Sequence, residues 1–351
     1  MDPGAKDERA MRRAIQLSRR GYPAPNPHVG CVIVSGGEIV GEGWHAYAGG
    51  PHAEVVALER AGPQARGAEV FVTLEPCNHS GRTGPCSQAL LDAGVARVVA
   101  ACADPNPVAR GGLARLQMAG VTTDLGLLAD EAADANLRFL TAMKRRRPYV
   151  VAKAALSADG RTALSSGESR WLTSEAARAA GRRLRAEMGA VLVGRGTVEA
   201  DDPQLTARVR GSRNEPVRIV LDPGGRLTGR ERVFREPGEV IQVVQEAERG
   251  AGHQLVAPYH GGEFHLPELL SLLFRRGITG VLVEGGAKTL GAFVRAGLVD
   301  RYELFLAPLL LGSGPAWVND LGIEALVEAP RLTLLRSKLI GPDLWLTLTP
   351  A

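Results

Sequence analysis

The residues best suited to chemistry lie between positions 52 and 86. His52 and Glu54 stand at the start of an expected helix, and Cys77 and Cys86 flank a loop that follows an expected strand. One imidazole and two thiolates would give Zn²⁺ three protein ligands and leave its fourth tetrahedral position for water. Zinc lowers the pKa of such a water to roughly 7, and Glu54 could carry its proton to a leaving amine. The pattern therefore predicts a catalytic zinc centre of the deaminase type.

Other interpretations of this cluster remain open. A structural zinc site normally has four protein ligands, and His79 is the nearby side chain that could be the fourth. The cysteines could also be buried as small apolar side chains. We adopt that interpretation for Cys31 and Cys102, which lie within apolar strand patterns. The ligand set itself would accept other soft divalent ions.

Composition limits the other classes of function. The chain has 351 residues, a length that argues for about two domains. Its net charge of +4 is divided evenly between the halves and aromatic residues make up 5%, which does not favour a nucleic-acid-binding surface. There is no long apolar run for a membrane span and no apolar core of a secretion signal near the N-terminus. Four cysteines are too few for a disulfide scaffold, so we expect a cytoplasmic protein.

The elements that must position the zinc ligands follow from the apolar pattern. Helical spacing predicts a helix over residues 8–20, and a Gly-Gly turn joins expected strands at 28–35 and 37–45. Two more strands are expected at residues 68–76 and 97–104. Four more helices are expected over residues 52–61, 86–94, 111–120 and 127–144. This alternation predicts a mostly parallel sheet covered on both faces.

A cluster of basic residues at 144–147, followed by Pro148, marks the expected domain boundary. We therefore predict domains at residues 1–147 and 148–351. In the second, strands are expected at residues 149–156, 190–194, 217–222, 239–244, 278–286 and 301–308. Helices are expected over residues 174–187, 266–276 and 287–297. The chain should end in a hairpin of residues 331–341 and 343–350, which distinguishes this half from a plain doubly wound fold.

Several motifs, in the same order along nearly the whole chain, resemble the bifunctional deaminase/reductase family of riboflavin biosynthesis. They are PNPHVG, GEGWH, PCNHSGRTGPC and DPNP in the first half, and KAALSADGRTA, RWLTS, ADDPQLTAR and VEGGAKTLG in the second. The resemblance implies an α/β protein, with a cytidine-deaminase-like α/β/α sandwich followed by a dihydrofolate-reductase-like α/β domain. It also implies a zinc-dependent hydrolase that deaminates 2,5-diamino-6-(5-phosphoribosylamino)pyrimidin-4(3H)-one. An NADPH-dependent oxidoreductase would then reduce the ribosyl group of the product, 5-amino-6-(5-phosphoribosylamino)uracil, to ribityl.

For the deaminase half, the resemblance implies one zinc ion per chain on His52, Cys77 and Cys86, with Glu54 as the proton shuttle. It places a further set of residues around the pyrimidine and phosphate, namely Asn26, His45, His79, Arg82, Asp104 and Asn106. Taken alone, some of these residues allow plainer interpretations. Asn is common in turns such as the two Pro-Asn-Pro sequences, and His45 could be a structural histidine.

For the reductase half, the resemblance implies a cofactor site and a sugar-phosphate site. The NADPH positions are Ala155, Trp171, Thr197, Asp201, Gly286, Ala287, Lys288, Thr289, Leu290, Gly291 and Ala292. The substrate positions are Ser169, Arg185, Leu205, Arg208 and Glu284. The residue types agree, since glycine junctions before helices suit a pyrophosphate and guanidinium groups bind phosphate bidentately.

Two other positions in this half stand out. Lys153 is one of five lysines beside 37 arginines, and an ammonium can transfer a proton whereas a guanidinium cannot. We therefore consider Lys153 a catalytic candidate, although a chance surface lysine is an open alternative. Pro223 stands where the family often has a residue with a hydroxyl group. Proline has no hydroxyl, so Pro223 cannot make a cofactor contact of that kind.

Two different functions were weighed against this interpretation. A deaminase of tRNA or DNA would need a basic, aromatic surface, which the composition does not provide. A non-enzymatic protein with structural zinc would be favoured by loss of Glu54 or of the glycine loops, and these are intact. We expect a small-molecule substrate, no nucleic-acid or membrane partner, and a homo-oligomer, either a dimer or a tetramer.

Overall fold

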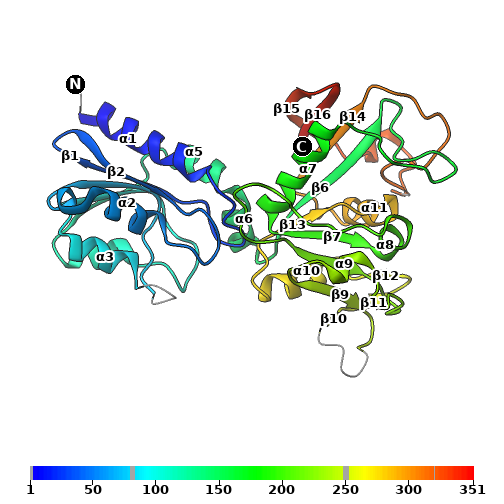
Figure 1. Ribbon diagram of the computed structural model, residues 1–351, viewed down its shortest axis with the longest axis horizontal. Coiled ribbons are helices and arrows are strands. Elements are labelled where there is room, and N and C mark those ends of the chain that lie inside the picture. Colours follow the sequence, from blue (N-terminus) through cyan, green and yellow to red (C-terminus); the bar gives the residue numbers. More distant parts are fainter. Residues whose placement is uncertain (1–2, 80–83, 248–252, 320) are drawn as a thin grey trace. The chain divides into compact units, whose positions relative to one another are not determined.

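The chain forms two compact units, Met1–Arg145 and Arg146–Ala351 (Figure 1). The computed structural model describes residues 3–79, 84–247, 253–319 and 321–351. The division between the units falls within the cluster of basic residues. Among the described residues, every helix is too short or too polar to cross a lipid bilayer.

The first unit contains a five-stranded sheet of order β2-β1-β3-β4-β5. Its strands are β1 (Gly30–Ser35), β2 (Glu38–Trp44), β3 (Glu69–Leu74), β4 (Arg97–Cys102) and β5 (Thr122–Leu125). β1 pairs antiparallel with β2 and with β3, whereas β3, β4 and β5 run parallel. The sheet is therefore mixed where a mostly parallel one was expected, because the Gly36-Gly37 turn with positive φ closes β1 and β2 into a hairpin.

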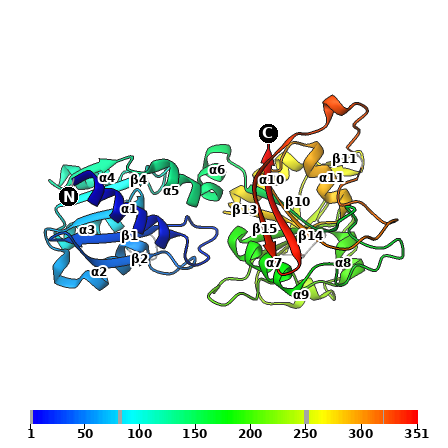
Figure 2. The ribbon, with the colours of Figure 1, turned by 90° about the horizontal axis from the view of Figure 1, so that it is seen from above.

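Helices cover both faces of this sheet and make three layers, which Figure 1 shows from the side, whereas Figure 2 looks down on the face of α1. α1 (Pro3–Ser18) and α5 (Ala129–Ala135) pack on one face. α2 (Ala53–Ala61), α3 (Cys86–Ala93) and α4 (Gly112–Met118) pack on the other, and the 3₁₀ turn Gly62–Ala65 follows α2. Each interface has its own apolar core, with Met11 and Phe71 on the first face and Val70 and Leu90 on the second. The unit is an α/β/α sandwich.

The prediction of one helix over residues 127–144 is wrong. The structure has two helices, α5 and α6 (Leu137–Arg145), separated at Asn136. The buried side chain of Asn136 accepts a hydrogen bond from the backbone N–H of His28 at 3.0 Å. The break between the two helices thus coincides with a contact to a loop that is distant in sequence. The helical periodicity of the sequence does not reveal such a contact.

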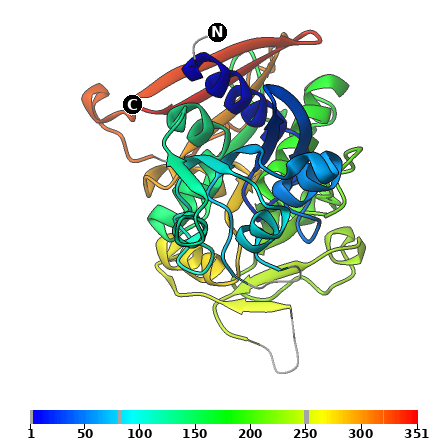
Figure 3. The same ribbon diagram turned by 90° about the vertical axis from the view of Figure 1, so that its left-hand side faces the viewer.

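The second unit contains a nine-stranded sheet of order β10-β9-β8-β7-β13-β6-β14-β16-β15. Its strands are β6 (Tyr149–Ser157), β7 (Ala190–Gly194), β8 (Val217–Leu221), β9 (Val240–Val244), β10 (Gln254–Val256), β13 (Gly280–Val283), β14 (Arg301–Ala307), β15 (Leu332–Ile340) and β16 (Asp343–Pro350). Pairing is parallel from β10 to β14, and β14, β16 and β15 pair antiparallel. The expected C-terminal hairpin forms the edge of the sheet (Figure 3).

Helices also cover both faces of the second sheet. Apolar side chains of α7 (Glu175–Met188), α8 (Arg195–Asp201) and α9 (Arg232–Arg235) pack on one face. Those of α10 (Leu266–Arg275) and α11 (Ala287–Arg295) pack on the other. A short hairpin of β11 (Tyr259–His260) and β12 (Glu263–Phe264) precedes α10, and the 3₁₀ turn Leu326–Glu328 precedes β15. The sequence analysis did not predict β5, β10, β11, β12 or α9.

Candidate active sites

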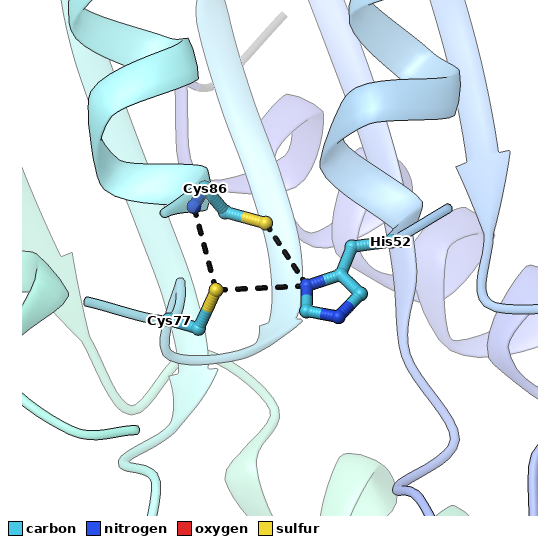
Figure 4. Close-up of side chains that lie close together, drawn as sticks. All are labelled: His52, Cys77 and Cys86. Carbon is cyan, nitrogen blue, oxygen red and sulfur yellow. Dashed lines mark hydrogen bonds between the residues drawn. The ribbon is translucent and has the colours of Figure 1, made fainter. Parts of the chain in front are cut away.

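Three predicted ligands meet in the first unit (Figure 4). His52 is the N-cap residue of α2, Cys86 is the first residue of α3, and Cys77 lies in the loop after β3. The Nδ1 atom of His52 lies 3.2 Å from Sγ of Cys86 and 3.5 Å from Sγ of Cys77. The three donor atoms lie within 4.8 Å of one another, and no other such cluster occurs among the described residues.

The donor set fits a zinc ion. Bonds of about 2.0 Å to nitrogen and about 2.3 Å to sulfur place neighbouring donors of a tetrahedral site roughly 3.5 Å apart. A hydrogen bond from Cys86 lowers the pKa of the Cys77 thiol, which favours a thiolate at Cys77. With three protein ligands, a fourth position stays open for water.

Two glycines of the GEGWH sequence fix the helix that carries His52 and Glu54. A Cβ atom on Gly43 would lie 2.1 Å from the carbonyl oxygen of Ala53, and one on Gly41 would lie 2.3 Å from that of Ala57. Both distances are far below van der Waals contact, so glycine is required for α2 to lie directly against β2. This close approach holds the start of α2 at the metal cluster.

Two polar residues that the sequence analysis missed hold the loop of Cys77. Glu75 accepts hydrogen bonds from the backbone N–H groups of Gly111 at 2.9 Å and Asp104 at 3.2 Å. Asn78 accepts one from the hydroxyl of Ser87 at 3.0 Å. The loops after β3 and β4 are thereby tied to each other and to α3.

Glu54 lies beside the metal cluster and is buried. Burial raises the pKa of its carboxyl group, and the nearby His52 partly opposes this shift. A raised pKa brings a carboxyl group closer to the range in which it can both take up and release a proton, as general acid/base catalysis requires. The position of Glu54 thus suits proton transfer at the metal-bound water.

Asn26 and His45 form a hydrogen-bonded pair next to the cluster. The Nδ2 group of Asn26 lies 3.0 Å from Nε2 of His45, and Nδ1 of His45 lies 3.0 Å from the carbonyl oxygen of Pro51. Burial lowers the pKa of His45, which favours the neutral ring. The rings of His45 and His52 are 5.4 Å apart in an edge-to-face arrangement.

The other predicted substrate residues of this half differ in their surroundings. The Nδ1 atom of His79 is buried and has no hydrogen-bond partner within the described part of the chain. Asp104 accepts the backbone N–H of Asn106 at 2.8 Å, and Asn106 accepts that of Val108 at 3.1 Å, so both shape the loop after β4. Burial raises the pKa of Asp104 to about 6. Arg82 lies outside the described residues.

The two remaining cysteines lie away from the cluster. Cys31 is fully buried in β1, as predicted. Cys102 is partly buried at the end of β4, where its thiol donates a hydrogen bond to the carbonyl oxygen of Ala129.

Replacing Cys86 with Ser should remove most of the bound zinc, because one of three protein ligands is lost from a site with no spare ligand among the described residues. The measurement is metal content per chain by elemental analysis of the purified full-length protein. Cys102→Ser is the matched control, since Ser can keep the hydrogen bond to Ala129, and it should retain zinc. A Cys86→Ser protein with full zinc would contradict the ligand assignment.

The second unit has a cavity of about 1100 Å³. It lies at the carboxyl ends of the parallel strands β6, β7 and β13. Sixteen of the residues that the sequence analysis assigned to this half line it together: Lys153, Ala155, Ser169, Trp171, Arg185, Thr197, Asp201, Leu205, Arg208, Glu284, Gly286, Ala287, Lys288, Thr289, Leu290 and Ala292. Gly291 does not line the cavity, and a Cβ atom there would lie 2.4 Å from the carbonyl oxygen of Asn319.

Glycines let the loops after β7 and β13 lie against each other. A Cβ atom on Gly194 would lie 2.8 Å from Oγ1 of Thr289, and one on Gly285 would lie 2.6 Å from its Cβ. The backbone N–H of Gly286 donates to Oγ1 of Thr197 at 3.2 Å. Gly286 is also the N-cap residue of α11, so the free backbone amides of that helix face this junction.

A buried ion-pair network lies in the cavity wall. Arg185 donates two hydrogen bonds to Glu284, at 2.7 and 2.9 Å, and Nζ of Lys153 lies 3.7 Å from the same carboxylate. Burial alone would raise the pKa of Glu284, but the charges of Arg185 and Lys153 outweigh it and lower that pKa to about 2. Glu284 is therefore a fixed negative charge that orients both cations.

Arg208 is the predicted phosphate ligand with the freer guanidinium. Within the described residues it donates one hydrogen bond, to Oε1 of Gln204 at 2.9 Å, whereas Arg185 is engaged by Glu284 and by the carbonyl oxygen of Thr206. Burial and the nearby charges of Arg185 and Arg182 lower the pKa of Arg208, which shows an accumulation of positive charge that suits an anion. Leu205 and Arg208 both have positive φ, a conformation that clusters at functional sites.

Several lining residues of the cavity were not predicted. They include three aromatic residues, Tyr259, Phe264 and Trp317, and two arginines, Arg178 and Arg195. The Gly261-Gly262 sequence between Tyr259 and Phe264 was the local signal that could have predicted the β11–β12 hairpin.

Glu284→Gln should lower the free energy of unfolding by about 3–5 kcal/mol, because it leaves the buried Arg185 without its counter-charge. Urea denaturation at pH 7 measures this. Glu175→Gln is the control, since Glu175 pairs with Arg178 and Arg182 at an exposed surface, where we expect a loss below about 1 kcal/mol. Equal losses for the two variants would contradict the buried network.

Comparisons with known proteins find a match in each unit. Residues 5–102 match the cytidine and deoxycytidylate deaminase zinc-binding region, and residues 148–346 match the RibD C-terminal domain. The chain is 45% identical to the riboflavin biosynthesis protein RibD of Escherichia coli (strain K12), over 99% of this chain and 100% of that protein. It is 40% identical to the riboflavin biosynthesis protein RibD of Aquifex aeolicus (strain VF5), over 96% and 97%.

Two solved structures share the whole architecture. Acinetobacter baumannii RibD (form 1) is 41% identical with a TM-score of 0.91, over 99% of each chain. The diaminohydroxyphosphoribosylaminopyrimidine deaminase/5-amino-6-(5-phosphoribosylamino)uracil reductase of Thermotoga maritima is 34% identical with a TM-score of 0.86, over 99% of each chain.

Proposed function

The chain belongs to the RibD family of bifunctional riboflavin-biosynthesis proteins, and from that premise we propose which residues perform each of its two reactions. It is a zinc-dependent deaminase and an NADPH-dependent reductase. The first unit removes the 2-amino group of 2,5-diamino-6-(5-phosphoribosylamino)pyrimidin-4(3H)-one. The second reduces the ribosyl group of 5-amino-6-(5-phosphoribosylamino)uracil. The observation that carries this division is that the three candidate metal ligands meet in the first unit, whereas sixteen candidate residues of the reductase line one cavity in the second.

In the first unit, His52, Cys77 and Cys86 would hold zinc, which supplies a hydroxide nucleophile at neutral pH. Glu54 takes the proton released at the nucleophile and passes it to the departing amine, which leaves as ammonia. Its burial and raised pKa support this assignment. Neutral His45, fixed by Pro51, and Asn26 orient the pyrimidine beside the metal ligands.

In the second unit, NADPH supplies hydride to C1′ of the sugar. Lys153 provides the proton that the ring oxygen needs as the ring opens. Its ammonium lies 3.7 Å from the ionised Glu284, which holds it in the cavity wall. Arg208 binds the sugar 5′-phosphate, and Ser169 and Leu205 complete the substrate wall.

We place the protein in the cytoplasm and propose that it forms a homo-oligomer, a dimer or a tetramer. The outer strand β15 supports this assembly because it exposes apolar side chains along an unpaired sheet edge, with Leu335 59% and Leu339 73% exposed. Such edges are normally covered in native proteins. A second copy of β15, paired antiparallel, would cover both the backbone groups and the leucines.

Sedimentation velocity of the full-length protein should show a dimer or larger, and Leu335→Glu should shift it toward monomer because a charge would then be buried in the contact. Leu310→Glu, at a leucine that is exposed outside β15, is the control and should leave the assembly unchanged. A monomeric wild-type protein would contradict the proposal.

Glu54→Gln should reduce deamination by about 10²- to 10⁴-fold, because Gln cannot transfer a proton. The variant should keep its zinc and should still oxidise NADPH when supplied with the deaminated pyrimidinedione. With the undeaminated substrate, NADPH consumption should stall. Ammonia release and NADPH absorbance measure the two reactions separately.

The control for this variant is Glu59→Gln, an exposed carboxylate on the same helix, which should behave as the wild type. Normal deamination by Glu54→Gln would contradict the proton-transfer assignment. Loss of both activities in a folded, zinc-loaded variant would contradict the division between two sites.

A further inference from the structure

A second, smaller cavity of about 220 Å³ adjoins the large cavity of the reductase unit. It is lined by Arg195, Pro223, Gly224, Arg226, Gln245 and Tyr259. Three of these residues, Arg195, Pro223 and Tyr259, also line the large cavity. None of the six belongs to the cofactor or substrate positions assigned above.

The small cavity lies at the carboxyl end of β8, in the unit β7-α8-β8. β7 and β8 are parallel neighbours, and the glycine junction of the cofactor cavity follows β7. In dinucleotide-binding βαβ units, side chains near the end of the second strand distinguish the two cofactors. An acidic residue there binds the ribose 2′-hydroxyl of NAD, whereas an arginine accommodates the 2′-phosphate of NADP.

An acidic residue is present at this position but faces the interior. Asp222 is fully buried, and its Oδ2 atom accepts hydrogen bonds from the backbone N–H of Leu227 and from Nε2 of Gln242, both at 2.9 Å. Its Oδ1 atom is also buried, has no hydrogen-bond partner within the described residues, and lies 3.8 Å from Nη1 of Arg195. A carboxylate held in this way is not available to a ribose hydroxyl.

The turn that follows β8 offers an anion no side-chain donor before Arg226. The backbone N–H of Gly225 donates to the carbonyl oxygen of Asp222 at 3.0 Å, and Pro223 stands at the second position of this turn. Proline has neither an N–H group nor a polar side chain, and Gly224 has no side chain. Of the other lining residues, Gln245 and Tyr259 offer neutral donors, so Arg195 and Arg226 are the two that carry a positive charge for an anion.

The two arginines differ in their present partners. Arg195 pairs with Glu199 at 3.3 Å through Nε and with Asp222 through Nη1, which leaves its Nη2 group for a ligand. Arg226 is exposed and has no hydrogen bond or ion pair with any residue that the structure describes. Arg195 is thus shared between two carboxylates, whereas Arg226 brings a positive charge that no carboxylate of the described residues pairs with.

We infer that Arg195 and Arg226 bind the 2′-phosphate of NADPH and make the reductase select this cofactor over NADH. Two guanidinium groups can form charge-assisted, bidentate hydrogen bonds to a phosphate. NADH has no 2′-phosphate, so it would leave both guanidinium groups without an anion. Its ribose 2′-hydroxyl would also find no partner in the buried Asp222. The inference rests on the proposed reductase function of the second unit.

The test uses two fragments of the cofactor, 2′,5′-ADP and 5′-AMP, which differ by the 2′-phosphate alone. Calorimetric titration of the full-length protein should show that Arg195→Gln and Arg226→Gln each weaken 2′,5′-ADP about ten- to a hundredfold. Binding of 5′-AMP should change less than about threefold. Arg276→Gln, an exposed arginine at the end of α10 outside both cavities, is the control with the same loss of charge and should bind both fragments as the wild type.

Steady-state kinetics give a second readout. The double variant should raise the KM for NADPH and leave that for NADH nearly unchanged, so that the preference between the cofactors is lost. Unchanged binding of 2′,5′-ADP by the double variant, or equal weakening of both fragments, would overturn the inference. Arginine-dependent binding of 2′,5′-ADP by a protein that reduces no pyrimidine would support this site and contradict the proposed function instead.

Discussion

Adjacent parallel strands end at the same edge of a sheet, and in both units a loop that follows such an end carries part of the site, with Cys77 after β3 and Glu284 after β13. In the first unit, Glu75 connects the loops after β3 and β4 through backbone hydrogen bonds to Asp104 and Gly111, which fixes the loop of Cys77. In the second, the backbone N–H of Glu284 donates to the carbonyl oxygen of Leu192 at 3.0 Å, which holds the ends of β13 and β7 together. Each site depends on this contact between strand ends.

Two buried carboxylates show how the surroundings divide chemical tasks. Glu54 is buried without a full counter-charge, and burial raises its pKa, which suits a group that takes up and releases a proton. Glu284 is also largely buried, but Arg185 and Lys153 keep it ionised, with a pKa of about 2. It cannot exchange protons near neutral pH and acts as a fixed charge. The same residue type thus serves as a proton carrier in one unit and as an anchor for cations in the other.

The sequence predicted the parts of the fold and site that depend on local patterns or on a strict chemical need. The strand over residues 190–194 has the predicted bounds. The three predicted zinc ligands lie together, and they could be recognised in the sequence because few types of side chain bind zinc. The helix over 127–144 was wrong because a distant loop uses Asn136. Glu75 bonds to a residue 36 positions away, and Arg195 is one of 37 arginines, so neither carried a local signal.

The central claim is that one chain performs two reactions in a fixed order at separate sites. The most direct test follows ammonia and NADPH together while the wild-type protein consumes the diaminopyrimidinone ribosyl phosphate. We predict equal final amounts of ammonia released and NADPH oxidised, with ammonia appearing first, and undiminished ammonia release when NADPH is left out. Oxidation of NADPH ahead of ammonia release, or ammonia release that requires NADPH, would contradict the account.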